Sequence, residues 1–147
     1  MKVRVKFSKY GPVKFIGHLD VMRYFQKAMR RAEIDMCYSE GFSPHMIMSF
    51  ASPLGLGLES DGEYMDISVK QSPSSKEAVE RLNAVMAEGI EVLSWRELPE
   101  NSKNAMASVA GADYEVRFRE GYELEEGWKK KLEEFLALPE IRIMKET

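Results

Sequence analysis

Apolar and polar residues alternate strictly at the start of the chain, a pattern typical of a strand with one buried face. Val3, Val5 and Phe7 share one face in this pattern. The residues between them are all basic: Lys2, Arg4 and Lys6. The pair Gly11-Pro12 breaks the alternation. The first element is therefore predicted to be a half-buried strand with a basic outer face.

A helix is predicted over residues 17–33, with one apolar side and one basic side. The apolar residues recur at helical spacing and form a core-facing stripe: Val21, Met22, Phe25, Ala28, Met29 and Ala32. The opposite side carries four cations within about a quarter-turn of one another: Arg23, Lys27, Arg30 and Arg31. Asp20 falls in the first turn, where the helix dipole favours an acid.

The next elements complete a recognisable order. Two strands are predicted at 45–50 and 63–69, separated by a loop rich in Ser, Pro and Gly. A capping box at 74–77 begins a helix that ends at Gly89, and 90–95 is the following strand. This βαββαβ order predicts an α+β fold of the ferredoxin-like type. Its helices would cover one face of the sheet and leave the other open to a partner.

The pattern begins again in the last third of the chain. Two alternating segments flank an amphipathic helix, at 114–118, 124–138 and 141–144. We therefore expect a ferredoxin-like domain over 1–98 and a partial second ferredoxin-like unit over 99–147. The half-unit either pairs with the sheet of the first domain or belongs to a chain that naturally continues past its last residue.

Charge is distributed unevenly along the chain. Residues 1–50 contain nine Lys or Arg against four Asp or Glu, whereas the remainder contains twelve against twenty. This asymmetry favours a localised anionic partner, although an internally compensated surface explains it equally well. The single cysteine, Cys37, excludes an internal disulfide and a four-thiolate metal site. With no apolar run near the ~20 residues of a membrane span and no signal-peptide pattern, a cytoplasmic location without membrane contact is expected.

Four short motifs follow one another in the first half of the chain: KFIGHLD (14–20), GFSPH (41–45), SFASPLGLG (49–57) and SDGEYMD (60–66). In this order, with the arginine-bearing helix between the first two, they resemble the radical-SAM-linked family of bacterial domains. Members of that family form a C-terminal extension of a radical SAM protein or a small protein beside one. The resemblance implies a bacterial cytoplasmic protein with a radical SAM partner, and it implies no established reaction.

The motifs also define candidate site residues, since they gather special backbone conformations and polar side chains at turns. These residues are Gly17, Asp20, Gly41, Phe42, Ser43, Pro44, Ser49, Pro53, Gly55 and Glu63. No GxGxxG or GK[ST] sequence accompanies the glycines, so a tight turn is the better interpretation than a nucleotide loop. No cofactor is expected.

The two histidines, His18 and His45, are the candidate catalytic residues because imidazole titrates near neutral pH. Each follows a glycine or proline in a turn, so capping or bridging of loops is the competing interpretation. Their spacing from Cys37 matches no recognised pattern of metal ligands, and no metal site is expected.

The cations of the predicted helix, with Lys14 just before it, are candidates for contact with the phosphates of RNA. The basic strand face would extend this patch, and nearby aromatic residues could stack on unpaired bases: Tyr10, Phe15, Tyr24, Tyr38 and Phe42. A solvated helix face explains the same cations without a partner.

Three functions of different kinds therefore remain open. The first and favoured one is a non-catalytic accessory domain of a radical SAM protein that contacts RNA or an RNA-linked substrate. The second is a stand-alone RNA-binding module. The third is a metal-free ribonuclease that uses His18 or His45.

Overall fold

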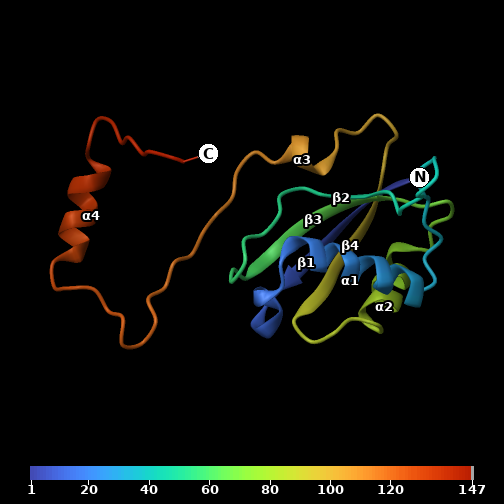
Figure 1. Ribbon diagram of the computed structural model, residues 1–147, viewed down its shortest axis with the longest axis horizontal. Helices are drawn as coiled ribbons and strands as arrows, with labels where there is room; N and C mark the ends of the chain where they lie inside the picture. Colours follow the sequence, from blue (N-terminus) through green and yellow to red (C-terminus); the bar gives the residue numbers. More distant parts are fainter. Residues whose placement is uncertain (147) are drawn as a thin grey trace. The chain divides into compact units, whose positions relative to one another are not determined.

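The computed structural model describes residues 1–146 and divides into two compact units, Met1–Gly111 and a second unit that begins at Ala112 (Figure 1). The first unit contains an open antiparallel sheet in the order β2-β3-β1-β4. Its elements are β1 (Lys2–Lys9), the 3-10 helix η1 (Gly11–Phe15), α1 (His18–Arg31), β2 (Met48–Phe50), β3 (Ser60–Ser68), α2 (Ser75–Asn83), β4 (Ile90–Leu98) and α3 (Ala105–Ser108). The predicted α+β class is confirmed in this general form.

Strand β1 lies in the middle of the sheet, where its apolar face becomes the centre of the core. It pairs with β3 on one side and β4 on the other, so that Val5 lies opposite both Met65 and Trp95. All three side chains are buried, as are Val3 and Phe7. The alternation at the start of the sequence thus places one set of side chains in the core and the other set on the opposite face.

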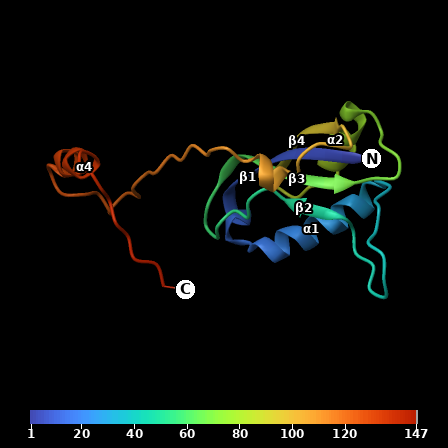
Figure 2. The same ribbon diagram turned by 90° about the horizontal axis from the view of Figure 1, so that it is seen from above.

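Helices α1 and α2 supply the other half of this core. The apolar stripe of α1 buries Val21, Phe25 and Met29 in the same cluster as the inward side chains of β1. Figure 2 shows α1 running along one side of the strands. Helix α2 begins at a capping serine, Ser74, whose hydroxyl accepts a hydrogen bond from the Glu77 amide, as the capping box predicts.

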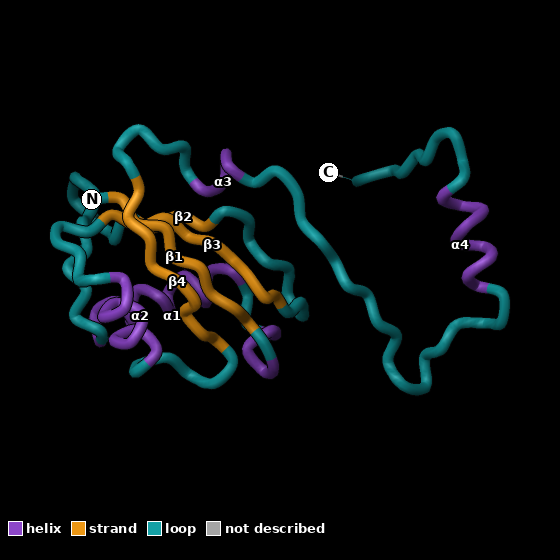
Figure 3. Tube along the Cα trace, turned by 180° about the vertical axis from the view of Figure 1, so that it is seen from behind, coloured by secondary structure: helices purple, strands orange, loops and turns teal. Residues whose placement is uncertain are grey.

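The opposite face of the sheet is partly covered, by the segment that follows β4. Figure 3 shows this segment leading to α3, which contacts β2 and β3. Lys2 Nζ donates to the Ser102 carbonyl at 3.2 Å, and an Arg4 nitrogen donates to the Lys103 carbonyl at 3.0 Å. The Ala105 amide donates to an Asp66 oxygen at 2.7 Å. The sheet face that we expected to be open to a partner is therefore only partly exposed.

One strand boundary differs from the predicted one because backbone pairing, not hydrophobicity alone, defines a strand. The strand predicted at 45–50 forms only as Met48–Phe50, and Met46 instead makes an isolated bridge with Tyr38. The break predicted at Gly11-Pro12 is a 3-10 helix with proline at its start, where a missing amide hydrogen costs nothing.

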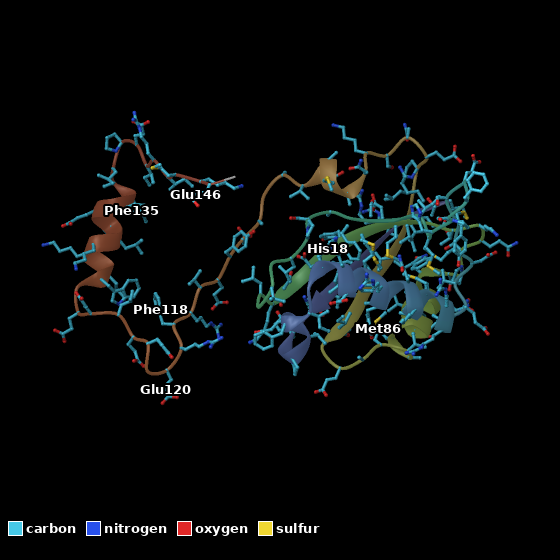
Figure 4. All side chains as sticks on the ribbon, in the orientation of Figure 1. His18, Met86, Phe118, Glu120, Phe135 and Glu146 are labelled. Carbon is cyan, nitrogen blue, oxygen red and sulfur yellow. The ribbon has the colours of Figure 1, made fainter. Side chains whose placement is uncertain are left out.

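The second unit forms one of its three predicted elements. Helix α4 (Trp128–Leu136) lies within the predicted helix at 124–138. The strands predicted at 114–118 and 141–144 are wrong for the structure as described, since neither segment is paired. Alternation alone does not make a strand without a neighbour to receive its hydrogen bonds. Within this unit the Phe118 and Trp128 rings meet edge to face at 5.9 Å, and Figure 4 labels Phe118 beside the helix.

Candidate functional site

Three of the four sequence motifs meet at one end of the sheet, around the start of α1. The Gly57 amide donates to the Lys14 carbonyl at 2.7 Å, which ties the 49–57 motif to the 14–20 motif. The Ala51 amide donates to the Tyr64 carbonyl at 2.9 Å, which ties it to the 60–66 motif. Contacts between distant segments thus assemble what the sequence presents as separate motifs. We call this region the motif cluster.

The motif cluster surrounds a cavity of about 10 Å³. It is lined by Phe7, Lys9, His18, Val21, Phe50, Ser52, Leu54 and Glu63. A space of this size holds about one water molecule, and the polar groups of the lining could satisfy its hydrogen bonds. The cavity is too small for a nucleotide.

Lys9 is the residue of this cluster that the sequence analysis did not identify. Its side chain is only 2% exposed, and its Nζ donates to the Ile16 carbonyl at 2.9 Å. Burial lowers the pKa of Lys9, and the nearby Glu63 carboxylate opposes that change only in part. The sequence did indicate this burial. If the alternation of β1 is extended two residues beyond Phe7, Lys9 falls on the inner face of the strand.

His18 occupies the first position of α1, after Gly17, and Figure 4 marks it there. Its ring packs edge-on against Phe50 at 5.0 Å, and Phe50 in turn packs edge-on against Phe7. This aromatic contact favours a packing role for His18, alongside its place on the cavity wall. Its candidacy as a catalytic residue stays a prediction.

His45 lies away from the motif cluster. His18 lines the same cavity as Glu63, which lies in the first half of β3. The 41–45 loop lies by the other end of β3, where the Cys37 amide donates to the Ser68 carbonyl. The His45 Nδ1 and the Ser39 hydroxyl are 2.9 Å apart, and the same hydroxyl accepts from the His45 amide. The two histidines therefore do not form one site, and His45 closes its own loop.

The four cations of α1 form an exposed surface on the side of the helix away from the sheet, which we call the α1 basic face: Arg23, Lys27, Arg30 and Arg31. Arg23 is 3.4 Å from Asp20, in a pair whose side chains are both largely exposed and therefore contribute little to stability. Over residues 1–146, no carboxylate pairs with the other three cations. This surface is available to an anionic partner.

The expectation that the β1 cations extend this patch is wrong. Val3 and Val5 are buried on the face that α1 covers, so Lys2, Arg4 and Lys6 project from the opposite face. Arg4 is also engaged by Asp66 through two hydrogen bonds of 2.8 and 3.0 Å, which raise the pKa of Arg4. The molecule carries two basic surfaces separated by the sheet.

The remaining predicted residues have separate positions. Lys14 lies in η1, with its ammonium 5.3 Å from the Phe15 ring centroid. Phe42 in the 41–45 loop is fully exposed, whereas the Tyr24 hydroxyl accepts a hydrogen bond from the Ala87 amide. Over the described chain, no three His, Cys, Asp or Glu side chains are placed to hold a metal ion. Nor does any helix of residues 1–146 have the length and apolar character needed to cross a membrane.

The family model described as "Uncharacterized protein conserved in bacteria (DUF2344)" matches residues 2–147, and the chain belongs to that family. No curated protein matches this chain.

Proposed function

We propose that this member of a bacterial family is a non-catalytic accessory domain that works with a radical SAM protein and contacts RNA through the α1 basic face. The four sequence motifs support the radical SAM partner through their resemblance to radical-SAM-linked domains. The α1 basic face supports the RNA contact.

The observation that carries the RNA contact is the exposure and spacing of the α1 cations. From Arg23 to Arg31 the helix rises about 12 Å, enough to follow several phosphates of a nucleic acid strand. Lys27, Arg30 and Arg31 are exposed and have no carboxylate partner within residues 1–146. Basic side chains that are not engaged within the protein can release counterions from a polyanion when it binds.

We also propose that the sheet and its two covering helices have the ferredoxin-like arrangement. The strand order β2-β3-β1-β4, with every neighbouring pair antiparallel, supports this assignment. So does the position of α1 and α2 on one face, which follows the βαββαβ order. On this arrangement a partner can approach from either the helix side or the free part of the sheet.

The test is fluorescence anisotropy with labelled RNA across a salt series, comparing the wild type with Arg30→Ala/Arg31→Ala. If both arginines contact phosphates, the slope of log K against log salt should become shallower by about 1.4 for single strands. Lys129→Ala/Lys130→Ala is the matched control, since it removes two exposed cations from α4 and leaves α1 intact. RNA recovered from each sample is run on a gel to detect cleavage.

Micromolar binding that weakens in the α1 variant and not in the control would support the proposal. Equal binding by wild type and α1 variant would refute the assigned surface, and cleaved RNA would refute the non-catalytic role. The partner is tested by co-elution of the chain with a radical SAM protein in gel filtration, where separate elution argues against the accessory role.

A further inference from the structure

The free part of the sheet face forms a second polar surface, distinct from the α1 basic face. Register places Lys6 of β1 opposite Tyr64 of β3 and Ser94 of β4. One pair further along, Arg4 lies opposite Asp66 and Arg96. These side chains share the face that α1 and α2 do not cover, because Val5 and its partners occupy the other.

The segment carrying α3 covers one end of this face and leaves the other free. Its hydrogen bonds go to Lys2, Arg4 and Asp66. Beyond them lie Lys6, Tyr64 and Ser94, while Arg96 lies on the β4 side of Arg4, and we call these four residues the sheet platform. The Tyr64 side chain is 41% exposed, and Ser94 and Arg96 are also exposed.

The sheet platform combines an aromatic ring with two cations, Lys6 and Arg96, that form no ion pair within residues 1–146. The Lys6 ammonium lies 5.7 Å from the centroid of the Tyr64 ring. Gly62 permits this position, because a Cβ on that residue would be 2.8 Å from Lys6 Cε. Asp66, the acid beside the platform, is already paired with Arg4. An aromatic surface bordered by cations has the chemistry that unpaired nucleotides need, stacking for the base and positive charge for the phosphate.

We propose that the sheet platform binds an unpaired nucleotide of single-stranded RNA. The base stacks on the Tyr64 ring, while Lys6 and Arg96 contact the adjoining phosphates. A duplex cannot use this surface in the same way, since its bases are already stacked and paired. The inference rests on the proposed RNA contact and adds to it a preference for single strands, on the sheet face opposite α1.

The experiment uses the full chain and a short single-stranded RNA containing 2-aminopurine, whose fluorescence is quenched when the base stacks on an aromatic ring. Tyr64→Leu should weaken binding about tenfold and abolish the quenching. Tyr64→Phe keeps the ring and should bind and quench as the wild type does. Tyr114→Leu is the matched control, since Tyr114 is 81% exposed but lies in the second unit.

Circular dichroism checks that each variant is folded, and Lys6→Gln/Arg96→Gln tests the surface without altering the ring. We expect this double variant to bind RNA more weakly than the wild type, and its affinity to depend less steeply on salt. Quenching at the wild-type level in Tyr64→Leu, or loss of quenching in Tyr114→Leu alone, would overturn the inference. If Arg30→Ala/Arg31→Ala still weakened RNA binding in that case, the proposed function would stand without this inference. If the wild type bound no RNA, both the inference and the proposed function would be overturned.

Discussion

Replacing Asp66 by alanine tests a carboxylate on the sheet face that accepts three hydrogen bonds. The Asp66 carboxylate is buried and accepts hydrogen bonds from two Arg4 nitrogens, at 2.8 and 3.0 Å, and from the Ala105 amide, at 2.7 Å. Asp66→Ala would remove both acceptor oxygens and so all three hydrogen bonds at once. It would leave the Arg4 guanidinium without its carboxylate partner and the buried Ala105 amide without an acceptor.

The size of the effect follows from the environment of these groups. Breaking a buried ion pair by removing one partner costs about 3–5 kcal/mol. The Arg4 side chain is still 22% exposed, so water compensates part of the loss. The segment around Ala105 can also move away and expose its amide. We therefore expect Asp66→Ala to lower the free energy of unfolding by about 3 kcal/mol, and Asp66→Asn by about half as much, since the amide keeps one acceptor oxygen.

Urea unfolding followed by tryptophan fluorescence measures this change. Trp95 is buried in the first unit and Trp128 lies in the second, so a Trp128→Phe background makes the signal report the sheet alone. A double-mutant cycle with Arg4→Ala isolates the pair, and we expect a coupling free energy above about 1 kcal/mol. A loss below 1 kcal/mol for Asp66→Ala, or a coupling energy near zero, would show that the ion pair does not stabilise the fold as argued.

Three further predictions concern single groups. Ser74→Ala should lower the free energy of unfolding by about 1 kcal/mol in urea titrations, because the Glu77 amide loses its cap, and an unchanged midpoint would contradict this role. Since the folded-state pKa of Lys9 lies below its ordinary value of 10.5, the unfolded chain binds more protons between those two values. Stability should therefore rise with pH through that window and stay constant below it, where Lys9 is protonated in both states, and Lys9→Met should flatten the slope measured by urea unfolding at several pH values; equal slopes would argue against a buried ammonium. Gly89→Ala should lower the melting temperature in calorimetry, because Gly89 has φ +102° and a Cβ there would meet the Tyr10 carbonyl oxygen; an unchanged temperature would contradict the close approach.

The elements of the first unit were largely predictable because their hydrophobic periods agree with their tertiary contacts. The apolar stripe of α1 and the alternation of β1 both face the core that the structure contains. The capping box also places the start of α2 correctly. Alternation failed at 114–118 and 141–144, where the described chain supplies no neighbouring strand. A sequence period specifies which side chains share a face and says nothing about whether a partner strand is present.

The candidate site was predictable as a set of motifs and not as a geometry. The sequence identified His18 and Glu63, which both line the small cavity, but His45 looked equivalent to His18 and lies elsewhere. Lys9 was missed because a lysine is rarely buried, although its place in the alternation indicated it. The separation of the two basic surfaces depends on which face of the sheet α1 covers, and that is set by long-range packing.

The segment that crosses the sheet face is attached almost entirely through its backbone. Lys2 and Arg4 bind the carbonyls of Ser102 and Lys103, and Asp66 binds the amide of Ala105. The chemistry that fixes the segment is therefore encoded in β1 and β3. Side chains at 102 and 103 can change over evolution without loosening it, whereas the Asn104 side chain caps α3 by accepting from the Ala107 amide. Position 105 is restricted to a small residue with an amide hydrogen, which excludes proline.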